Sequence, residues 1–190
     1  TVALATTTHF MPFPGVATVA GHDVDEVRAA LAAGGVACVA APAEGPAGAA
    51  GKLGPGALAP AELARLADYV LVEADGSRRL PLKAHAIWEP VVPAGSTQSV
   101  LVVGASGFGQ PVREAVHRPE RFCELARCSP DDVATPDAVA AVIRAEGLAS
   151  RVTVNQCEGE GALAYARRLE ALLDVPVAAG SLREGRLERL

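Results

Sequence analysis

Short apolar runs alternate with amphipathic stretches along the chain. The apolar runs are rich in Val, Ala and Leu, and they predict strands at residues 1–5, 16–20, 36–40, 69–72, 100–103, 151–154 and 175–179. Between them, the spacing of apolar positions predicts helices at residues 23–33, 60–67, 120–127, 137–145 and 161–173. This alternation predicts an α/β fold of three layers, in which a mostly parallel sheet carries helices on both faces.

Local signals mark element ends and one long connection. Thr135 is a plausible N-cap, with Pro136 at the first helical position and Gly147 at the stop. The segment from Pro42 to Pro60 is rich in Gly, Pro and Ala and predicts a flexible surface loop rather than a domain boundary. With 190 residues, the chain is expected to form a single domain over residues 1–190.

Charge and cysteine content narrow the class of protein. A net charge of −5 and a pI near 5.4 argue against a nucleic-acid partner. No apolar run approaches the ~20 residues that span a bilayer, so we expect a cytoplasmic protein with no membrane association. The four cysteines contain no Cys-x-x-Cys pair and are interpreted as free thiols; a metal site formed by Cys123, Cys128 and His117 is the alternative.

The richest chemistry lies between Asp68 and His85. The run 69–72 predicts a strand buried on both faces, and Glu73 and Asp75 follow it on the same side if the chain stays extended. Gly76 then permits a sharp turn. The polar and charged residues that follow are Ser77, Arg78, Arg79, Lys83 and His85. Since ligands of open α/β sheets bind beyond the carboxyl ends of strands, this stretch is a site candidate. The alternative is a solvated loop in which Arg78 or Arg79 pairs with Glu73.

A second candidate follows the first strand. Thr6, Thr7, Thr8 and His9 place three hydroxyls and an imidazole at a strand's carboxyl end, where they can bind phosphate oxygens or hydrated Mg²⁺. A Thr run on the sheet surface is the structural alternative.

Three other features favour packing or loop roles. Trp88, the single tryptophan, is interpreted as a packing residue, with a stacking role as the alternative. The glycines at 104, 107 and 109 do not have Gly-x-Gly-x-x-Gly spacing, which favours a plain strand-exit loop. Lys52 lies in a Gly-Lys-Leu-Gly stretch that lacks the Walker A pattern.

Three segments together resemble the selenium-dependent hydroxylase accessory proteins (YqeC-like). They are Thr-Thr-Thr-His at 6–9, the stretch 68–85 with its Val-Glu-Ala-Asp-Gly-Ser core and Pro-Leu-Lys-Ala-His tail, and His-Arg-Pro-Glu at 117–120. The resemblance covers most of the chain. It implies a P-loop NTPase-like fold and a role in maturing molybdenum-containing hydroxylases. The partners it implies are such a hydroxylase or its cofactor-maturation machinery, together with a nucleotide.

The resemblance also assigns roles to residues. Asp75, with Glu73, would take the Walker-B-like position, and Thr8 with Asp75 would hold Mg²⁺ of a bound ATP or GTP. Catalytic or substrate-contacting roles fall on Asp75, Glu73, Lys83 and His85, as in an ATPase or GTPase. Nucleotide contacts fall on Thr6, Thr7, Thr8, Gly76, Ser77, Asn155 and Gln156. Asn155-Gln156 resembles a base-reading Asn-Lys-x-Asp motif in which Gln156 replaces Lys and Glu158 replaces Asp.

One departure from the family pattern leaves two hypotheses. Family members usually begin with a strand and a Gly-rich phosphate loop, which would precede Thr1, so this chain by itself is expected to bind nucleotide weakly. The missing strand would also expose a sheet edge at which another chain, as in a homodimer, could pair. The first hypothesis is a nucleotide-dependent maturation factor. The second is a non-catalytic module that docks on a hydroxylase or holds its cofactor.

Overall fold

The computed structural model describes residues 1–190 and divides into two compact units. The N-terminal unit contains Thr1–Gly76 and Glu89–Ser96, and the C-terminal unit contains Ser77–Trp88 and Thr97–Leu190. Each unit is therefore built from two separate stretches of chain. The division reflects how residue contacts cluster and does not decide whether the units fold as one domain, so the single domain expected from length stays a prediction.

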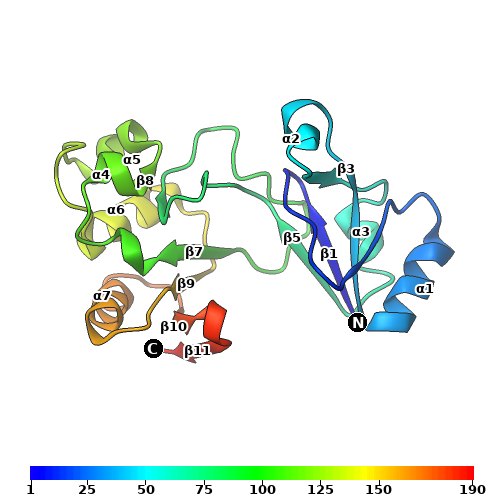
Figure 1. The fold of residues 1–190 in the computed structure, drawn as a ribbon. Helices are drawn as coiled ribbons and strands as arrows, with labels where there is room; N and C mark the ends of the chain where they lie inside the picture. Colours follow the sequence, from blue (N-terminus) through cyan, green and yellow to red (C-terminus); the bar gives the residue numbers. More distant parts are fainter. The chain divides into compact units, whose positions relative to one another are not determined.

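A parallel sheet forms the centre of the N-terminal unit (Figure 1). Its strands are arranged in the order β2, β3, β1, β5, and their bounds are β2 Ala17–Val19, β3 Val36–Pro42, β1 Val2–Thr6 and β5 Tyr69–Glu73. The short strand β4 (Leu53–Pro55) pairs antiparallel with β3. The helices of this unit are α1 Val24–Gly34, α2 Gly45–Ala49 and α3 Pro60–Leu63. All four predicted strands of this half are confirmed, with small shifts of their ends.

Burial of one face of α1 organises the core of this unit. Val27 and Leu31, four residues apart and so on one helix face, are buried against Ala3, Val39 and Leu63. Asp23 caps the helix start by accepting the N–H of Asp25, and Gly35 ends the helix in the left-handed conformation at φ 71°.

Strand β5 differs from the prediction of a strand buried on both faces. It lies at one end of the sheet order, next to β1, and its residues alternate between exposed and partly buried positions. Val70 and Val72 pack on the core, whereas Tyr69 and Leu71 are 67% and 57% exposed. The apolar run indicated a strand correctly, but it could not report that helices cover only one face of it.

The segment 42–60 also departs from the flexible loop that was predicted. It forms α2 and β4, and Leu53 exchanges two backbone hydrogen bonds with Phe10. Gly56 lies so close to β3 that an added Cβ would come within 3.0 Å of the Val39 backbone. Tertiary pairing with β3 and with the loop after β1 thus orders a segment whose composition favours disorder.

The C-terminal unit is built on a second sheet, in the order β11, β10, β9, β7 (Figure 1). Strands β7 Val100–Gly104, β9 Arg151–Asn155 and β10 Val177–Ser181 are parallel, whereas β11 Arg186–Arg189 runs antiparallel at the edge. A separate parallel pair joins β6 Leu82–Lys83 to β8 Val116–His117. The helices are α4 Val112–Ala115, α5 Pro119–Ala126, α6 Pro136–Glu146 and α7 Glu160–Glu170, with 3₁₀ turns η1 Ala105–Gly107 and η2 Leu182–Glu184.

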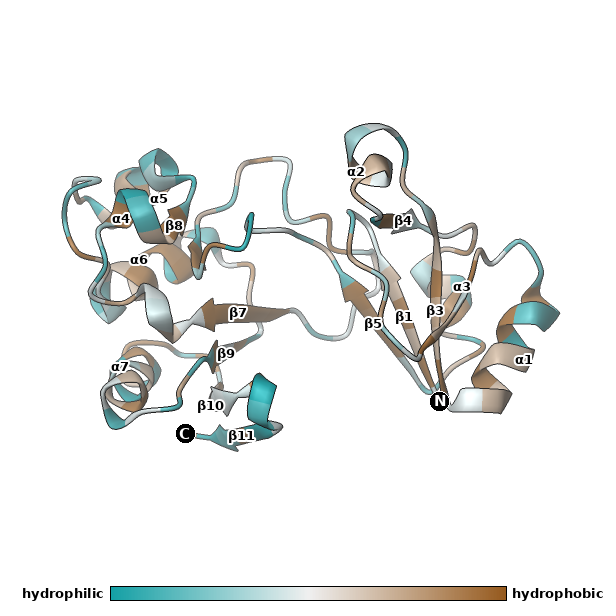
Figure 2. Ribbon diagram, viewed as in Figure 1, coloured by the Kyte–Doolittle hydropathy of each residue, from teal (hydrophilic) through white to brown (hydrophobic).

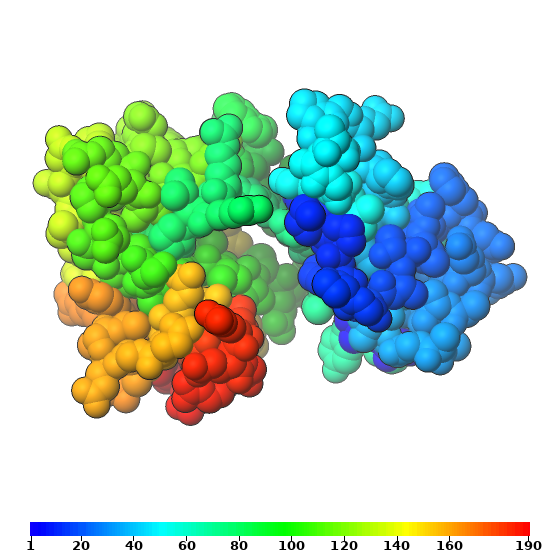
Figure 3. Space-filling model, viewed as in Figure 1, coloured from blue at the N-terminus to red at the C-terminus, as the bar shows by residue number.

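The interior of this unit is close-packed around Phe122, Val142, Val152 and Leu169, all at most 1% exposed. Strand β7 is apolar along its length, whereas β11 is polar (Figure 2). The residues of η2 and β11, red in Figure 3, lie at the surface, as the exposure of all four β11 residues requires. The predicted helix cap is confirmed: Thr135 accepts the N–H of Ala138, and Gly147 ends α6 at φ 61°.

Close packing accounts for the glycines after β7. A Cβ added to Gly104 would lie 2.7 Å from the Pro81 side chain, and one added to Gly107 would lie 2.6 Å from that of Leu82. These glycines let the strand-exit loop pass directly over the segment that contains β6, which supports a loop role rather than a dinucleotide motif.

The fold class is α/β with mostly parallel strands, as the alternation predicted. Where one sheet was expected, the hydrogen-bonded strands fall into three sheets, because strand patterns predict direction and burial but not which strands pair. None of the helices has the length and apolar character needed to span a bilayer.

Candidate functional site

In the N-terminal unit, the two stretches singled out from the sequence lie side by side. Strands β1 and β5 are parallel neighbours in which Thr6 is the register partner of Glu73. The carboxyl ends of both strands therefore lie at the same sheet edge. The Thr6 hydroxyl donates to the Glu73 carbonyl at 3.0 Å, and the N–H of Thr7 donates to the same oxygen at 3.0 Å.

The three threonines differ in how they are held. Thr6 is 3% exposed, and its Oγ1 accepts the N–H of Thr8 at 2.9 Å and lies 3.3 Å from the Thr8 hydroxyl. Thr7 donates its hydroxyl to the Val91 carbonyl at 2.8 Å, and Val91 in turn donates its N–H to Ala74. The segment 89–96 therefore hydrogen-bonds to this strand edge through Val91. Thr8 is partly exposed, as is Thr7, and its hydroxyl lies against the hydroxyl of Thr6.

The acidic side of this edge is electrostatically strained. Glu73 occupies an exposed position at the end of β5, yet neighbouring protein atoms desolvate its carboxyl and raise its pKa. The Lys52 ammonium opposes this rise, and the Asp75 carboxylate adds to it. The charges of Lys52 and Asp75 are therefore close enough to Glu73 to influence its pKa.

The donor set fits a hard cation. Carboxylate and hydroxyl oxygens of Glu73, Asp75, Thr6 and Thr8 are the ligand types that Mg²⁺ prefers. No group of three or more His, Cys, Asp and Glu side chains in residues 1–190 is arranged to hold a metal by itself. Mg²⁺ at this edge would accordingly keep waters or phosphate oxygens in its shell, as Mg²⁺ commonly does. The side chains of Cys123, Cys128 and His117, the alternative metal site, are likewise not arranged to hold a metal ion.

Lys52 lies close enough to Glu73 to lower its pKa, a position that its Gly-Lys-Leu-Gly surroundings do not predict. Its carbonyl accepts the N–H of Ala43, and the following residue, Leu53, pairs with Phe10 just beyond the threonines. No local signal predicts this, because the position of Lys52 depends on the pairing of β4 with β3.

Other predicted residues belong to the C-terminal unit. The Ser77 hydroxyl donates to the Leu80 carbonyl at 2.8 Å and closes a turn in which Arg78 and Arg79 both have positive φ. Lys83 lies in β6, in register with His117 of β8.

His85 is buried and bound to Glu146 at the end of α6. One Glu146 oxygen accepts the His85 backbone N–H at 2.6 Å, and the other lies 2.7 Å from the imidazole Nδ1. Both side chains are less than a tenth exposed. The carboxylate therefore fixes the ring orientation of His85 and stabilises a proton on Nδ1.

Asn155 and Gln156 lie at the carboxyl ends of the parallel strands of the C-terminal unit. Asn155 Oδ1 accepts the N–H of Leu182 at 2.9 Å, and Gln156 Oε1 accepts the Ser106 hydroxyl at 2.6 Å. Glu158 accepts the hydroxyl of Ser181 at 2.7 Å. These amide and carboxylate oxygens tie together the loops after β7, β9 and β10.

The structure thus gathers one subset of the predicted residues in each unit. Thr6, Thr7, Thr8, Glu73, Asp75 and Gly76 belong to the N-terminal unit, whereas Ser77, Lys83, His85, Asn155 and Gln156 belong to the C-terminal unit. Their roles in catalysis or binding stay predictions.

For Trp88, the structure favours the stacking alternative over the packing role. Its side chain is 71% exposed, and the Arg118 guanidinium lies 5.5 Å from the ring centroid. This cation–π geometry, at the left-handed residue that precedes α5, gives the ring a partner on the surface.

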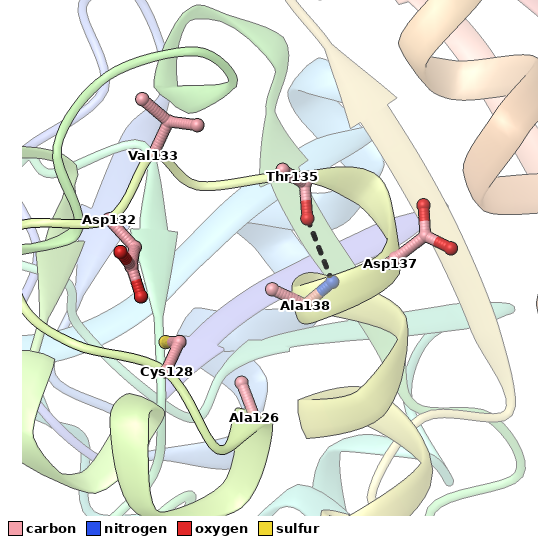
Figure 4. Close-up of a pocket in the computed structure, with 7 residues that line it drawn as sticks. All are labelled: Ala126, Cys128, Asp132, Val133, Thr135, Asp137 and Ala138. Atoms are coloured by element: carbon pink, nitrogen blue, oxygen red, sulfur yellow. Dashed lines mark hydrogen bonds between the residues drawn. The ribbon is translucent and has the colours of Figure 1, made fainter.

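A pocket of about 510 Å³ lies in the C-terminal unit, and none of the predicted catalytic or nucleotide-binding residues lines it (Figure 4). It is lined by Ala126, Cys128, Asp132, Val133, Thr135, Asp137 and Ala138. The Thr135 hydroxyl, which accepts the N–H of Ala138, and the Cys128 sulfur are both on its wall.

Comparison with known proteins adds a family to this geometry. The chain is 37% identical over 78 residues to the uncharacterized protein YqeC of Escherichia coli (strain K12). That match covers 40% of this chain and 30% of the relative, so the chain spans less than a third of the relative's length in this alignment. No solved structure matches. The family described as YqeC protein matches residues 1–120, which include both candidate strand ends and the His117–Glu120 block. The chain therefore belongs to the YqeC family.

Proposed function

We propose that the carboxyl edge of β1 and β5 is the Mg²⁺ side of a nucleotide site in a P-loop NTPase-like protein. The observation that carries this proposal is the register of Thr6 with Glu73, which puts three threonines and two mutually repelling carboxylates at one strand edge. Asp75 and Thr8 would hold Mg²⁺, with Glu73 near it and Thr6 and Thr7 shaping the loop. Mg²⁺ would supply charge neutralisation of the ATP or GTP phosphates.

The remaining predicted residues have supporting roles in this proposal. Gly76 follows the carboxylates within the N-terminal unit and would contribute to the same loop. Ser77, Lys83, His85, Asn155 and Gln156 belong to the C-terminal unit, and the substrate and nucleotide contacts that the family resemblance implies for them are a separate part of the proposal. Glu146, by accepting from His85, keeps the imidazole in one orientation.

In the cell, we infer an accessory role in the maturation of molybdenum-containing, selenium-dependent hydroxylases in the cytoplasm. The inference rests on the resemblance of the segments at 6–9, 68–85 and 117–120 to the selenium-dependent hydroxylase accessory proteins, whereas the family match gives the family and no function. The partner would be the hydroxylase or its cofactor-maturation machinery, and the nucleotide would time an association or release step, as Mg²⁺-dependent switches do.

Calorimetric titration of the natural protein, including any residues that precede Thr1, tests the nucleotide site. ATP and GTP are titrated with Mg²⁺ and with EDTA into the unmodified protein, Asp75→Asn and Thr8→Val. We expect Mg²⁺-dependent binding that weakens about tenfold or more in Asp75→Asn, because a charge-assisted contact is worth roughly 1.5–3 kcal/mol.

The matched control is Asp25→Asn, an exposed acid on α1 that pairs with Arg28 in the same unit. It should leave affinity unchanged. Absence of binding at millimolar nucleotide, or equal losses in Asp25→Asn and Asp75→Asn, would contradict the proposal.

Exposed apolar side chains favour a second function, that of a docking module. Ile87 and Trp88 are 99% and 71% exposed at adjacent positions, and such residues commonly contact protein partners. A pull-down of the hydroxylase separates the two functions. A docking module loses the partner in Trp88→Ala and supports maturation in Asp75→Asn, whereas a nucleotide-dependent factor keeps the partner but fails to mature it in Asp75→Asn.

A further inference from the structure

Two cysteines of the C-terminal unit lie next to each other. The Sγ atoms of Cys123 and Cys128 are 3.6 Å apart, and both residues are partly exposed. The other two cysteines, Cys38 and Cys157, belong to different units and have other neighbours: Cys157 lies near the Val154 and Ala162 carbonyls.

The backbone at the end of α5 creates this proximity. Arg127 takes the left-handed conformation at φ 56° and ends the helix. The N–H groups of Arg127 and Cys128 then both donate to the Cys123 carbonyl, the latter at 3.2 Å. The chain turns back, and Cys128 comes to lie against the helical turn that carries Cys123.

We propose that Cys123 and Cys128 form a reversible intramolecular disulfide, so that the end of α5 is a redox modification site. A disulfide needs its sulfurs at about 2.0 Å, so the observed separation closes by roughly 1.6 Å, which side-chain rotation supplies. The native backbone hydrogen bonds already hold the two residues in one turn, and little chain entropy remains to be lost on closure.

The pocket determines which thiol reacts first. Cys128 lies on its wall, where a small disulfide such as glutathione disulfide reaches it (Figure 4). Burial, reinforced by Cys128, Asp132 and Glu120, raises the pKa of Cys123 to about 11, so Cys123 is the protonated, resolving thiol at neutral pH.

The reaction balances with a low-molecular-weight disulfide as oxidant. The Cys128 thiolate attacks one sulfur of glutathione disulfide, the S–S bond breaks, and one glutathione leaves as its thiolate. Cys123 then loses its proton to solvent, and its sulfur attacks Sγ of Cys128. The mixed disulfide breaks and releases the second glutathione. Two protein thiols are oxidised, one disulfide is reduced, and the two protons end on the two glutathione thiols.

The experiment equilibrates the full chain with glutathione buffers of increasing disulfide fraction, followed by acid quenching, alkylation and intact-mass measurement. We expect a loss of about 2 Da, two hydrogens, that is reversed by dithiothreitol. Trypsin cleaves after Arg121, Arg127 and Arg144, so the two cysteines fall in separate peptides, 122–127 and 128–144, that only a disulfide can join. This peptide pair should appear in the unmodified chain, so the test does not depend on a variant folding.

Two substitutions of Arg127 provide a matched test of the geometry, read by intact mass. Arg127→Gly retains the left-handed turn, and its oxidation rate should be close to that of the unmodified chain. Arg127→Val disfavours positive φ and should slow intramolecular closure about tenfold, with mixed glutathione adducts accumulating instead. The proposal is overturned if no linked peptide forms at any buffer ratio, if Cys157 or a second chain is the partner, or if the Gly and Val variants oxidise equally.

Discussion

At the scale of single residues, the titration of Glu73 reports on the candidate site. Burial raises its pKa, Asp75 raises it further and Lys52 lowers it. Because the folded chain binds this proton more readily than the unfolded chain, Glu73 favours folding at acidic pH. That contribution is lost as pH rises through the raised pKa. Perturbed carboxyls occur both at functional sites and in structural ion-pair networks, so the pKa shift supports the site only together with the strand register.

The signs of these effects give a prediction for carboxyl titration by ¹³C NMR. The Glu73 midpoint should lie above that of an exposed glutamate such as Glu26 in the same spectrum. It should fall in Asp75→Asn, which removes a like charge, and rise in Lys52→Ala, which removes an opposite charge. A midpoint that does not respond to either substitution would show that neither Asp75 nor Lys52 interacts electrostatically with Glu73 in solution.

At the scale of elements, a single carboxylate joins the segment after β6 to the end of α6. Glu146 accepts two hydrogen bonds from His85, and both side chains are buried. Removal of one partner from such a pair leaves a buried polar group unsatisfied, which costs far more than the loss of a surface pair.

Glu146→Ala is therefore expected to lower the free energy of unfolding by roughly 3 kcal/mol, measured by urea denaturation. Glu146→Gln retains one acceptor oxygen and should cost less. Glu124→Ala, which removes an exposed partner of Arg121 at 3.0 Å, is the control and should change stability by about 0.5 kcal/mol or less. Equal effects of Glu146→Ala and Glu124→Ala would mean that the His85 pair does not hold these elements together.

At the scale of the whole molecule, the interleaving of the two units limits where the chain can be cut. Residues 77–88 precede the N-terminal unit's second stretch, 89–96, yet Leu82, Ala84 and His85 within them are buried in the C-terminal unit. A boundary placed after residue 96 would remove β6 from its partner β8.

Two fragments test this division. Residues 77–190 contain every residue of the C-terminal unit and should unfold cooperatively, as judged by circular dichroism during thermal melting. Residues 97–190 lack Leu82 and Ala84, whose loss opens the core beside Val116, and should melt without a cooperative transition or at a much lower temperature. Equal cooperativity of both fragments would contradict the assignment of residues 77–88 to this unit.

Features that depend on neighbouring residues could be predicted from the chain alone. Seven of the strands, the Thr135 cap and the two strand-end motifs followed from periodicity, hydroxyl chemistry and recognisable segments, all of which act over a few residues, whereas short elements such as β4, β6, β8 and β11 were not predicted. The polar cluster at 73–77 was found in this way, and its role stays a prediction.

Tertiary structure decided what depends on distant pairing. The partial exposure of β5, the ordering of residues 42–60, the position of Lys52 near Glu73 and the contact of His85 with Glu146 all arise from residues far apart in sequence. The Cys123–Cys128 contact needed the left-handed turn at Arg127. Arginine has no preference for that backbone conformation, so the sequence does not predict the turn. Periodicity indicates which face of an element is apolar, but only the assembled chain determines what covers that face.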